Sequence, residues 1–276
     1  MKEIKIKKLE RKRIEKNIFH FIFLLVVMLF TFSSCSAQQI IITEVKYDKI
    51  VVNSVEDIYQ KRDGLFVFSD INIDLRKIPS EKRKDVFVKL LLPSIEVVQQ
   101  EVLNNREIVK KLKVKKELTE NEKIYAEKLF KKYRTEYGKW NELESKMIVY
   151  PASLILTQGA IESAWGTSRF FREANNAFGV WSTNPNEPRI AAKGSRGNFT
   201  PYLKKYDTLK DTVEDITLII SRSSAYTGAR KMIWEGKSPY EIAGGLTKYS
   251  EEGKEYVRKV RSTLKYNNFH EYDNMI

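Results

Sequence analysis

The clearest helical pattern in the chain lies between residues 151 and 166. Positions of one face recur there at intervals of four, three and four residues, which is the period of an α-helix. Pro151 suits the first turn of such a helix, and Gly166 marks its end. The face consists of Leu154, Gln158, Ile161 and Trp165. The spacing therefore predicts a helix with one buried stripe.

Helical spacing recurs on both sides of this segment. An apolar face begins near Ser80 and continues to Ile108, with a kink permitted at Pro93. Further helices are expected to open at Thr119 and at Asp207-Thr208, which are good N-cap residues. Shorter helices are expected at Arg230–Trp234, Pro239–Ala243 and Glu251–Leu264.

Strand patterns are few and short. Three follow the central helix, separated by loops rich in Gly, Pro and Asn, and they indicate a small antiparallel hairpin or three-stranded lobe. They cover 178–181, 189–192 and 199–206. Other short strands are expected at 40–42, 49–52 and 65–68, with one or two helical turns at 54–60. The chain is thus predicted to be mainly α, in an α+β fold.

The first residues have the pattern of a targeting segment. A basic stretch precedes the apolar run 18–32, which has the length of a signal-peptide core and falls short of the roughly 20 residues that a spanning helix needs. The run ends in Phe-Ser-Ser-Cys-Ser, which resembles a bacterial lipobox with the lipid on Cys35. Phe32 stands where that motif has a leucine-like residue. We expect a signal peptide or a lipoprotein signal.

The composition narrows the class of protein. The 49 Lys and Arg residues outnumber the 36 Asp and Glu residues, giving a formal net charge of +13. The chain has no basic motif interleaved with aromatics and no zinc or helix-turn-helix signature, so nucleic acid is not expected as a partner. One cysteine forms no internal disulfide, and two histidines make no zinc-peptidase site. Neither a metal nor an organic cofactor is expected.

One carboxylate stands out on the central helix. Glu162 lies in its last turn among glycine, alanine and serine residues. Burial among small neighbours and the negative end of the helix dipole both favour the protonated form of the side chain. A protonated carboxyl group is what a general acid requires at neutral pH.

Three blocks of sequence resemble one family of enzymes. The block 158–170, Gln-Gly-Ala-Ile-Glu-Ser-Ala-Trp-Gly-Thr-Ser-Arg-Phe, is similar to the catalytic-glutamate motif of bacterial glucosaminidases, lysozyme-like enzymes that cut peptidoglycan. The resemblance continues through 175–181 and returns at 246–260. The helical segment 81–95 resembles the one before the catalytic domain of Bax-like proteins with a glucosaminidase domain. The resemblance implies a lysozyme-like fold, with a helical lobe and a small antiparallel β-hairpin lobe.

The resemblance and the patterns together divide the chain into four parts. We expect a signal segment at 1–35, a tether or small N-terminal element at 36–78, a helical support region at 79–147 and the catalytic domain at 148–270. No internal repeat is visible. We expect a monomer.

The second catalytic group is less clearly marked than the first. Glycosidases commonly pair an acid with a second carboxylate. Glu187 is the only carboxylate between Ala174 and Tyr206, where the resembling family carries a second glutamate. It is therefore the candidate base, and a solvent-exposed turn residue is the alternative interpretation. The 2-acetamido group of the substrate is another candidate nucleophile.

Sugar binding requires aromatic faces and hydrogen-bonding groups in an open groove. The resemblance implies that Tyr249 and Tyr256 belong to a tyrosine motif near the acid, and that Asn176 and Phe178 belong to an Asn-x-Phe-Gly element beside it. About half of such aromatics pack in the core instead of lining a groove. The candidates are Trp165, Asn176, Phe178, Trp181, Tyr202, Tyr226, Tyr249 and Tyr256.

The expected function is hydrolysis of the β-1,4 bond after N-acetylglucosamine in peptidoglycan. A muramidase or lytic transglycosylase acting on the same polymer is one alternative, and a non-catalytic, lipid-anchored wall-binding protein is another. Peptidoglycan strands are the expected partner, and the membrane is a second one, through Cys35 or an N-terminal anchor. The expected location is the bacterial cell envelope, facing the periplasm.

Overall fold

The computed structural model describes residues 40–193 and 200–274. The chain divides into two compact units, 1–41 and 42–276, and every element described below belongs to the second. The expected signal segment and Cys35 lie outside the described residues. Within the described ranges, no helix is long and apolar enough to cross a membrane.

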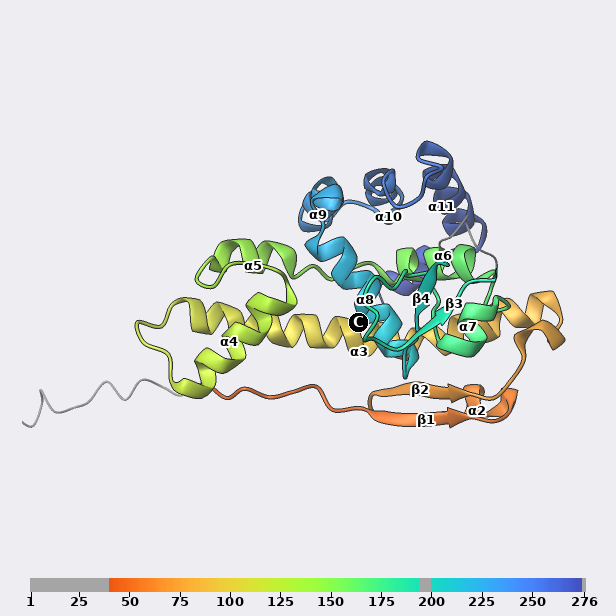
Figure 1. Ribbon diagram of the computed structural model, residues 1–276, viewed down its shortest axis with the longest axis horizontal. Coiled ribbons are helices and arrows are strands. Elements are labelled where there is room, and N and C mark those ends of the chain that lie inside the picture. The colour runs from red at the N-terminus through yellow and green to blue at the C-terminus, as the bar shows by residue number, and fades with distance from the viewer. Residues whose placement is uncertain (1–39, 194–199, 275–276) are drawn as a thin grey trace, which may run out of the picture. The chain divides into compact units, whose positions relative to one another are not determined.

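A long helix forms the spine of this unit. Helix α3 (Ser80–Lys113) passes through Pro93 without interruption and buries one face along its length. Helix α6, helix α8 and strand β2 all contact it. In Figure 1, strands β1 and β2 lie side by side along one edge of the unit, and helices α9 to α11 follow one another along the opposite edge.

The segment before α3 is a small β-α-β element. Strand β1 (Asp48–Val52) pairs in parallel with β2 (Phe66–Ile71), and α2 (Val55–Tyr59) connects them. The short helix η1 (Leu75–Lys77) leads into α3. The strands expected at 49–52 and 65–68 are confirmed, whereas 40–42 forms no strand. Val67 and Phe68 are fully buried, so this element is part of the packed core.

The other helices follow in chain order. Between α3 and the hairpin lie α4 (Glu120–Lys132), α5 (Trp140–Lys146), α6 (Ala152–Ser163) and α7 (Arg169–Ala174). After the hairpin come α8 (Leu209–Arg222), η2 (Ser224–Tyr226), α9 (Thr227–Trp234), α10 (Pro239–Ile242), η3 (Ala243–Leu246), α11 (Lys254–Tyr266) and η4 (Phe269–Asn274).

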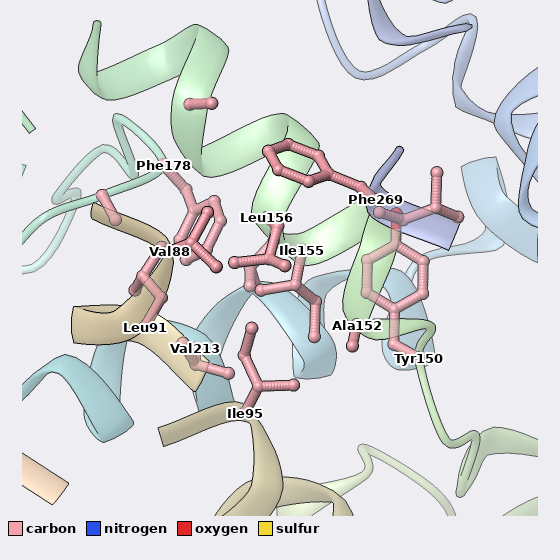
Figure 2. Packing of buried hydrophobic residues seen from close by; sticks show 14 of the residues in the cluster. Val88, Leu91, Ile95, Tyr150, Ala152, Ile155, Leu156, Phe178, Val213 and Phe269 are labelled. Carbon is pink, nitrogen blue, oxygen red and sulfur yellow. The ribbon is translucent and has the colours of Figure 1, made fainter. Parts of the chain in front are cut away.

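Helix α6 is buried on nearly every side. Its first nine residues, Ala152 to Ala160, are all buried, so it is a core helix instead of a surface helix with one stripe. Figure 2 shows Ile155 and Leu156 of α6 among core side chains that include Val213 of α8. The first turn of α6 has no side-chain cap, because its N-cap residue is Pro151. The Asp273 carboxylate of η4 accepts a hydrogen bond from the Ser153 N–H of this turn at 2.9 Å instead.

A small antiparallel hairpin completes the unit. Strand β3 (Arg189–Ala191) pairs with β4 (Tyr202–Lys204), and Trp181 forms a single bridge with Leu203. This confirms the predicted mainly helical α+β architecture, a helical lobe with a small antiparallel β-hairpin lobe. The expected third strand is reduced to that single bridge.

Candidate active site

The end of α6 is wound into an unusual turn. Ala164, Trp165 and Gly166 have φ values of 50°, 59° and 75°, three left-handed residues in succession. A β-carbon at Gly166 would stand 2.6 Å from a side-chain carbon of Leu75, so only glycine fits there. Ser163 Oγ accepts a hydrogen bond from the Gly166 N–H at 2.8 Å and closes the turn. The turn fixes the end of the helix directly after Glu162.

The carboxyl group of Glu162 lies half-buried beside two tyrosines. Burial raises its pKa, and the charge of Glu252 adds to this effect. A hydrogen bond from Tyr256 and the charge of Lys259 act in the opposite direction without cancelling it. The direction agrees with the expectation from the small neighbours along the helix. Glu162 therefore holds a proton at higher pH than an ordinary glutamate does.

Tyr249 and Tyr256 form one wall beside this carboxyl group. Their rings are stacked with centroids 5.1 Å apart and planes 20° apart. The Tyr249 hydroxyl donates a hydrogen bond to the Phe178 carbonyl at 3.5 Å. Burial raises the pKa of both hydroxyls, so both tyrosines remain neutral hydrogen-bond donors.

The turn 176–180 also borders the carboxyl group, since a β-carbon at Gly179 would lie 4.0 Å from Glu162 Oε2. The Asn176 side chain accepts a hydrogen bond from the Val180 N–H at 3.0 Å and donates to the carbonyls of Val180 and Lys204 at 3.0 and 2.9 Å. Asn176 is 1% exposed and Phe178 is 3% exposed. Both side chains are therefore buried and support the conformation of the turn. The turn contains Gly179, at φ 64°.

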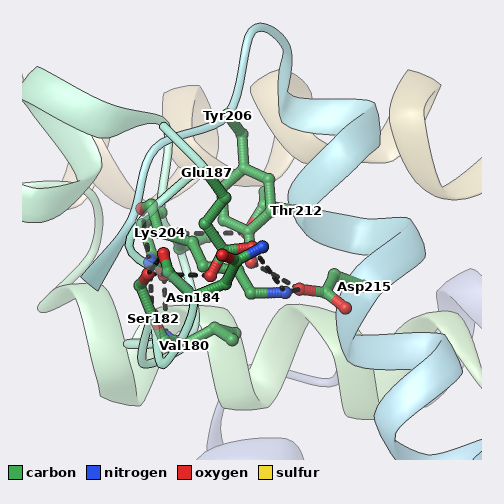
Figure 3. A network of polar contacts seen from close by, with 10 residues as sticks. Val180, Ser182, Asn184, Glu187, Lys204, Tyr206, Thr212 and Asp215 are labelled. Atoms are coloured by element: carbon green, nitrogen blue, oxygen red, sulfur yellow. Dashed lines mark hydrogen bonds and ion pairs between the residues drawn. The ribbon is translucent and has the colours of Figure 1, made fainter. Parts of the chain in front are cut away.

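Glu187 lies in a separate polar network at the foot of the hairpin (Figure 3). Ser182 Oγ donates to its Oε1 at 2.7 Å, and Lys204 Nζ lies 3.9 Å from Oε2. Lys204 also pairs with Asp215 of α8 at 2.8 Å. Lys204 thus links Glu187 to α8, and none of the contacts described for Glu187 reaches Glu162.

The other aromatic residues predicted to bind sugar differ in the exposure of their side chains. Trp165 packs edge-on against Phe87, with ring centroids 5.8 Å apart, and against Phe269 on the other side. Tyr226 is 6% exposed and belongs to the core. Trp181 is 51% exposed on the hairpin. Among the predicted aromatics, Trp181 therefore has the most exposed ring surface, while Trp165, Tyr202 and Tyr249 are half-buried.

The sequence analysis did not predict the hydrogen-bonding roles of two buried polar residues in this region. Gln158 was placed in the buried stripe as a packing position, and Tyr150 received no role. Both are fully buried, and the Tyr150 hydroxyl donates to Gln158 Oε1 at 2.6 Å. A glutamine within a buried stripe is the signal that could have revealed this network. In the described part of the chain, no cluster of His, Cys, Asp and Glu could hold a metal ion.

Comparison with known proteins relates this region to glycoside hydrolases. Residues 137–269 match the model of the Glucosaminidase family, described as mannosyl-glycoprotein endo-beta-N-acetylglucosaminidase. The matched segment contains Glu162, the hairpin and both tyrosines of the wall, whereas α3 and α4 precede it.

Individual proteins resemble parts of the chain that differ in length. The protein bax of Escherichia coli (strain K12) is 26% identical over 199 residues, which cover 66% of this chain and 69% of that protein. The catalytic domain of the autolysin Auto from Listeria monocytogenes aligns with a TM-score of 0.38 and 16% identity, covering 62% of this chain and 97% of that chain. The glycoside hydrolase domain of Salmonella typhimurium FlgJ aligns with a TM-score of 0.34 and 25% identity, covering 43% and 75% respectively.

Proposed function

We propose a reaction for this chain from the premise that it is a Bax-like protein with a glucosaminidase domain, and hence a glycoside hydrolase. The proposed reaction is hydrolysis of the β-1,4 bond on the reducing side of N-acetylglucosamine in peptidoglycan. One observation carries the proposal: Glu162 lies half-buried in the last turn of α6, with Gly179 of the 176–180 turn facing its Oε2.

Glu162 acts as the general acid in this proposal. Its protonated carboxyl group gives a proton to the glycosidic oxygen as the bond from that oxygen to the anomeric carbon breaks. The carboxylate that remains is stabilised by the hydrogen bond from Tyr256 and by the positive charge of Lys259. The same group is then able to take a proton from water in the second half of the reaction.

The nucleophile in the first step is proposed to be the substrate itself. Ser182 and Lys204 engage both oxygens of Glu187, and these contacts favour a route that needs one enzyme carboxylate. The acetamido oxygen forms a bond to the anomeric carbon as the leaving oxygen departs with the proton of Glu162. Water then opens the cyclic intermediate and returns a proton to Glu162. Action by Glu187 as a base is the alternative, and a substitution in the Discussion tests it.

The contacts of Glu187 also favour a second candidate function. A lytic transglycosylase works with a single carboxylate, so the same observation fits cleavage with formation of an anhydro sugar. The two reactions differ in the new ends that they leave on the glycan.

Product analysis separates these reactions. We would digest purified peptidoglycan with residues 36–276, use Glu162→Gln as the control and identify the fragments by mass spectrometry. Fragments ending in reducing N-acetylglucosamine support the proposal. Anhydro or reducing N-acetylmuramic acid ends assign the chain to the transglycosylases or muramidases. Wall binding without cleavage by the folded protein indicates a non-catalytic wall-binding protein.

We further propose that the chain is exported and held in the cell envelope by lipid on Cys35, facing the periplasm as a monomer. The lipobox-like sequence and the apolar run before it support this location. Replacement of Cys35 by serine is expected to abolish incorporation of a labelled fatty acid and to release the protein from the membrane fraction. Light scattering of the released protein tests the monomeric state.

A further inference from the structure

A buried chain of hydrogen bonds runs from the core to the candidate acid. The Tyr150 hydroxyl donates to Gln158 Oε1 at 2.6 Å, and Gln158 Nε2 donates to the Tyr256 hydroxyl at 3.4 Å. The Tyr256 hydroxyl in turn faces the carboxyl group of Glu162, whose pKa it lowers. The three residues behind Glu162 are between 0% and 2% exposed, so water does not compete for these groups.

The number of available hydrogens sets the direction of this chain. A tyrosine hydroxyl has one hydrogen to donate, and the carboxylate of Glu162 takes the one on Tyr256. The Tyr256 oxygen must then accept from Gln158, and only the amide nitrogen of Gln158 can donate. The amide oxygen of Gln158 is thereby turned toward Tyr150, which supplies the last hydrogen.

The hydrogen bonds can also run in the reverse direction when Glu162 is protonated. The carboxyl group then donates to the Tyr256 oxygen, and Tyr256 donates to the amide oxygen of a flipped Gln158. The amide nitrogen of Gln158 donates to the Tyr150 oxygen. In this reverse state the hydrogen of the buried Tyr150 hydroxyl has no acceptor among the four residues, and the two states differ by one proton and one amide rotation.

We infer that Tyr150 and Gln158 are positioning residues that fix the direction of the Tyr256 hydroxyl and thereby tune the protonation of Glu162. The inference rests on the proposed function only because Glu162 is the residue whose protonation Tyr150 and Gln158 are inferred to tune. Neither residue touches a substrate in this assignment. Tyr150 favours the direction that supports the carboxylate, because its hydroxyl satisfies the amide oxygen of Gln158.

Substitutions at Tyr150 and Gln158 leave the other groups that face Glu162 unchanged. Tyr249 stands against Tyr256, while Glu252 and Lys259 supply one negative and one positive charge from the α11 side. None of these three takes part in a hydrogen bond with Tyr150 or Gln158 that the structure describes. Changes in the titration of Glu162 can therefore be traced to the chain itself.

Removal of the Tyr150 hydroxyl should reverse the direction of the hydrogen bond between Gln158 and Tyr256. In Tyr150→Phe the amide oxygen of Gln158 loses its donor and turns to take the hydrogen of Tyr256, because a buried oxygen without a donor is costly. The carboxylate then loses its hydrogen bond. We expect the pKa of Glu162 to rise by about 1, the equivalent of one hydrogen bond to a charged group.

The double substitution provides the decisive comparison. In Gln158→Met no amide oxygen competes for the Tyr256 hydrogen, so the pKa of Glu162 stays near its wild-type value. Adding Gln158→Met to Tyr150→Phe should therefore restore the pKa that Tyr150→Phe alone has raised. A purely structural role for the two residues predicts a double variant that is at least as disturbed as either single one.

The measurement is an NMR titration of the Glu162 carboxyl carbon in protein labelled with ¹³C-glutamate, assigned by difference from Glu162→Gln. Tyr133→Phe is the matched control, since Tyr133 is also 1% exposed and packs away from the site; it should lose stability without moving the titration. An unchanged pKa in Tyr150→Phe overturns the inference, and so does a double variant that keeps the raised value. The titration requires no cleavage, so failure of the proposed reaction is recognised separately by the peptidoglycan digest.

Discussion

Gly179 faces the carboxyl group of Glu162. A β-carbon at Gly179 would stand 4.0 Å from Oε2 of Glu162. The turn that carries Gly179 is held by the Asn176 side chain, and the helix that carries Glu162 ends in three left-handed residues. Two independently fixed backbones therefore approach each other at this point. The space between Gly179 and the carboxyl group is where the leaving oxygen of a substrate would meet its proton.

The first prediction concerns this space. Gly179→Ala places a methyl group beside the carboxyl group at a backbone φ of 64°, which costs roughly 1 kcal/mol in stability for a residue with a β-carbon. We expect turnover of peptidoglycan to fall more than about tenfold, because a misplacement of about 1 Å near the reacting atoms has effects of that size or larger.

Gly236→Ala is the matched control. Gly236 has a nearly equal φ of 66°, and no atom lies within 4 Å of the position that a β-carbon would take, so it carries the same backbone strain far from steric contact. Its stability loss should equal that of Gly179→Ala, with turnover retained. Equal turnover in the two variants would show that Gly179 does not border the reacting groups.

The second prediction follows from the raised pKa of Glu162. A carboxyl group with a higher pKa in the folded state stabilises the fold fully at low pH, and this contribution is lost as the pH rises from the ordinary value of 4.5 through the raised one. Glu162→Gln removes the buried charge. The variant should therefore gain melting temperature relative to wild type as the pH rises through this window, with no further gain above it.

Activity should fall over the same range in the wild type, because only the protonated Glu162 can donate. The melting curves and the falling limb of kcat/KM should report the same pKa. A melting-temperature difference that does not depend on pH would contradict the burial of this group.

The third prediction tests the second carboxylate. Glu187→Gln keeps an oxygen that accepts from Ser182 and removes the charge that faces Lys204. If the acetamido group of the substrate is the nucleophile, kcat should fall by less than about tenfold, against a loss on the order of 10³-fold or more for Glu162→Gln. A loss in Glu187→Gln as large as that in Glu162→Gln would make Glu187 the second catalytic group.

The fourth prediction concerns acid stability. Burial alone would raise the pKa of Glu214, but the charges of Lys132 and Lys210 lower it to about 2. A lowered pKa stabilises the folded state above the ordinary value, and that stability is lost as the pH falls toward 2. Glu214→Gln should therefore cost about 2 to 3 kcal/mol at pH 7 and almost nothing near pH 2, as measured by urea unfolding.

An exposed ion pair serves as the comparison for Glu214. Glu235 lies 3.7 Å from Lys231 on the surface of α9, and Glu235→Gln should change stability by less than about 0.5 kcal/mol at either pH. A cost for Glu214→Gln as small as this would mean that its two lysines do not act on a buried charge.

The sequence was sufficient to locate Glu162 and the hairpin because both depend on local patterns. The helix around Glu162 is marked by helical spacing and by Gly166, and the hairpin strands are bounded by turn residues. Local signals of this kind are visible in one sequence.

The remainder of the site depends on contacts between distant parts of the chain. Gln158 and Tyr256 are 98 residues apart, and the parallel pairing of β1 with β2 joins segments on either side of a helix. Asn176 shows the same difficulty, since its amide joins its own turn to Lys204 and is too buried to meet a sugar. Spacing along a sequence carries no information on which distant residues meet.

Helix α6 is completed at both ends by residues that follow it at great distance. Asp273 supplies the hydrogen-bond acceptor for its first turn, and Tyr256 supplies the hydroxyl beside Glu162 in its last turn. A chain that emerges from the ribosome, or crosses a membrane, with its N-terminus first exposes Glu162 long before either partner. The acid therefore lacks its hydroxyl partner until residues beyond 250 have followed. In the proposed reaction, the catalytic site is therefore complete only after the C-terminal part of the domain has folded onto α6.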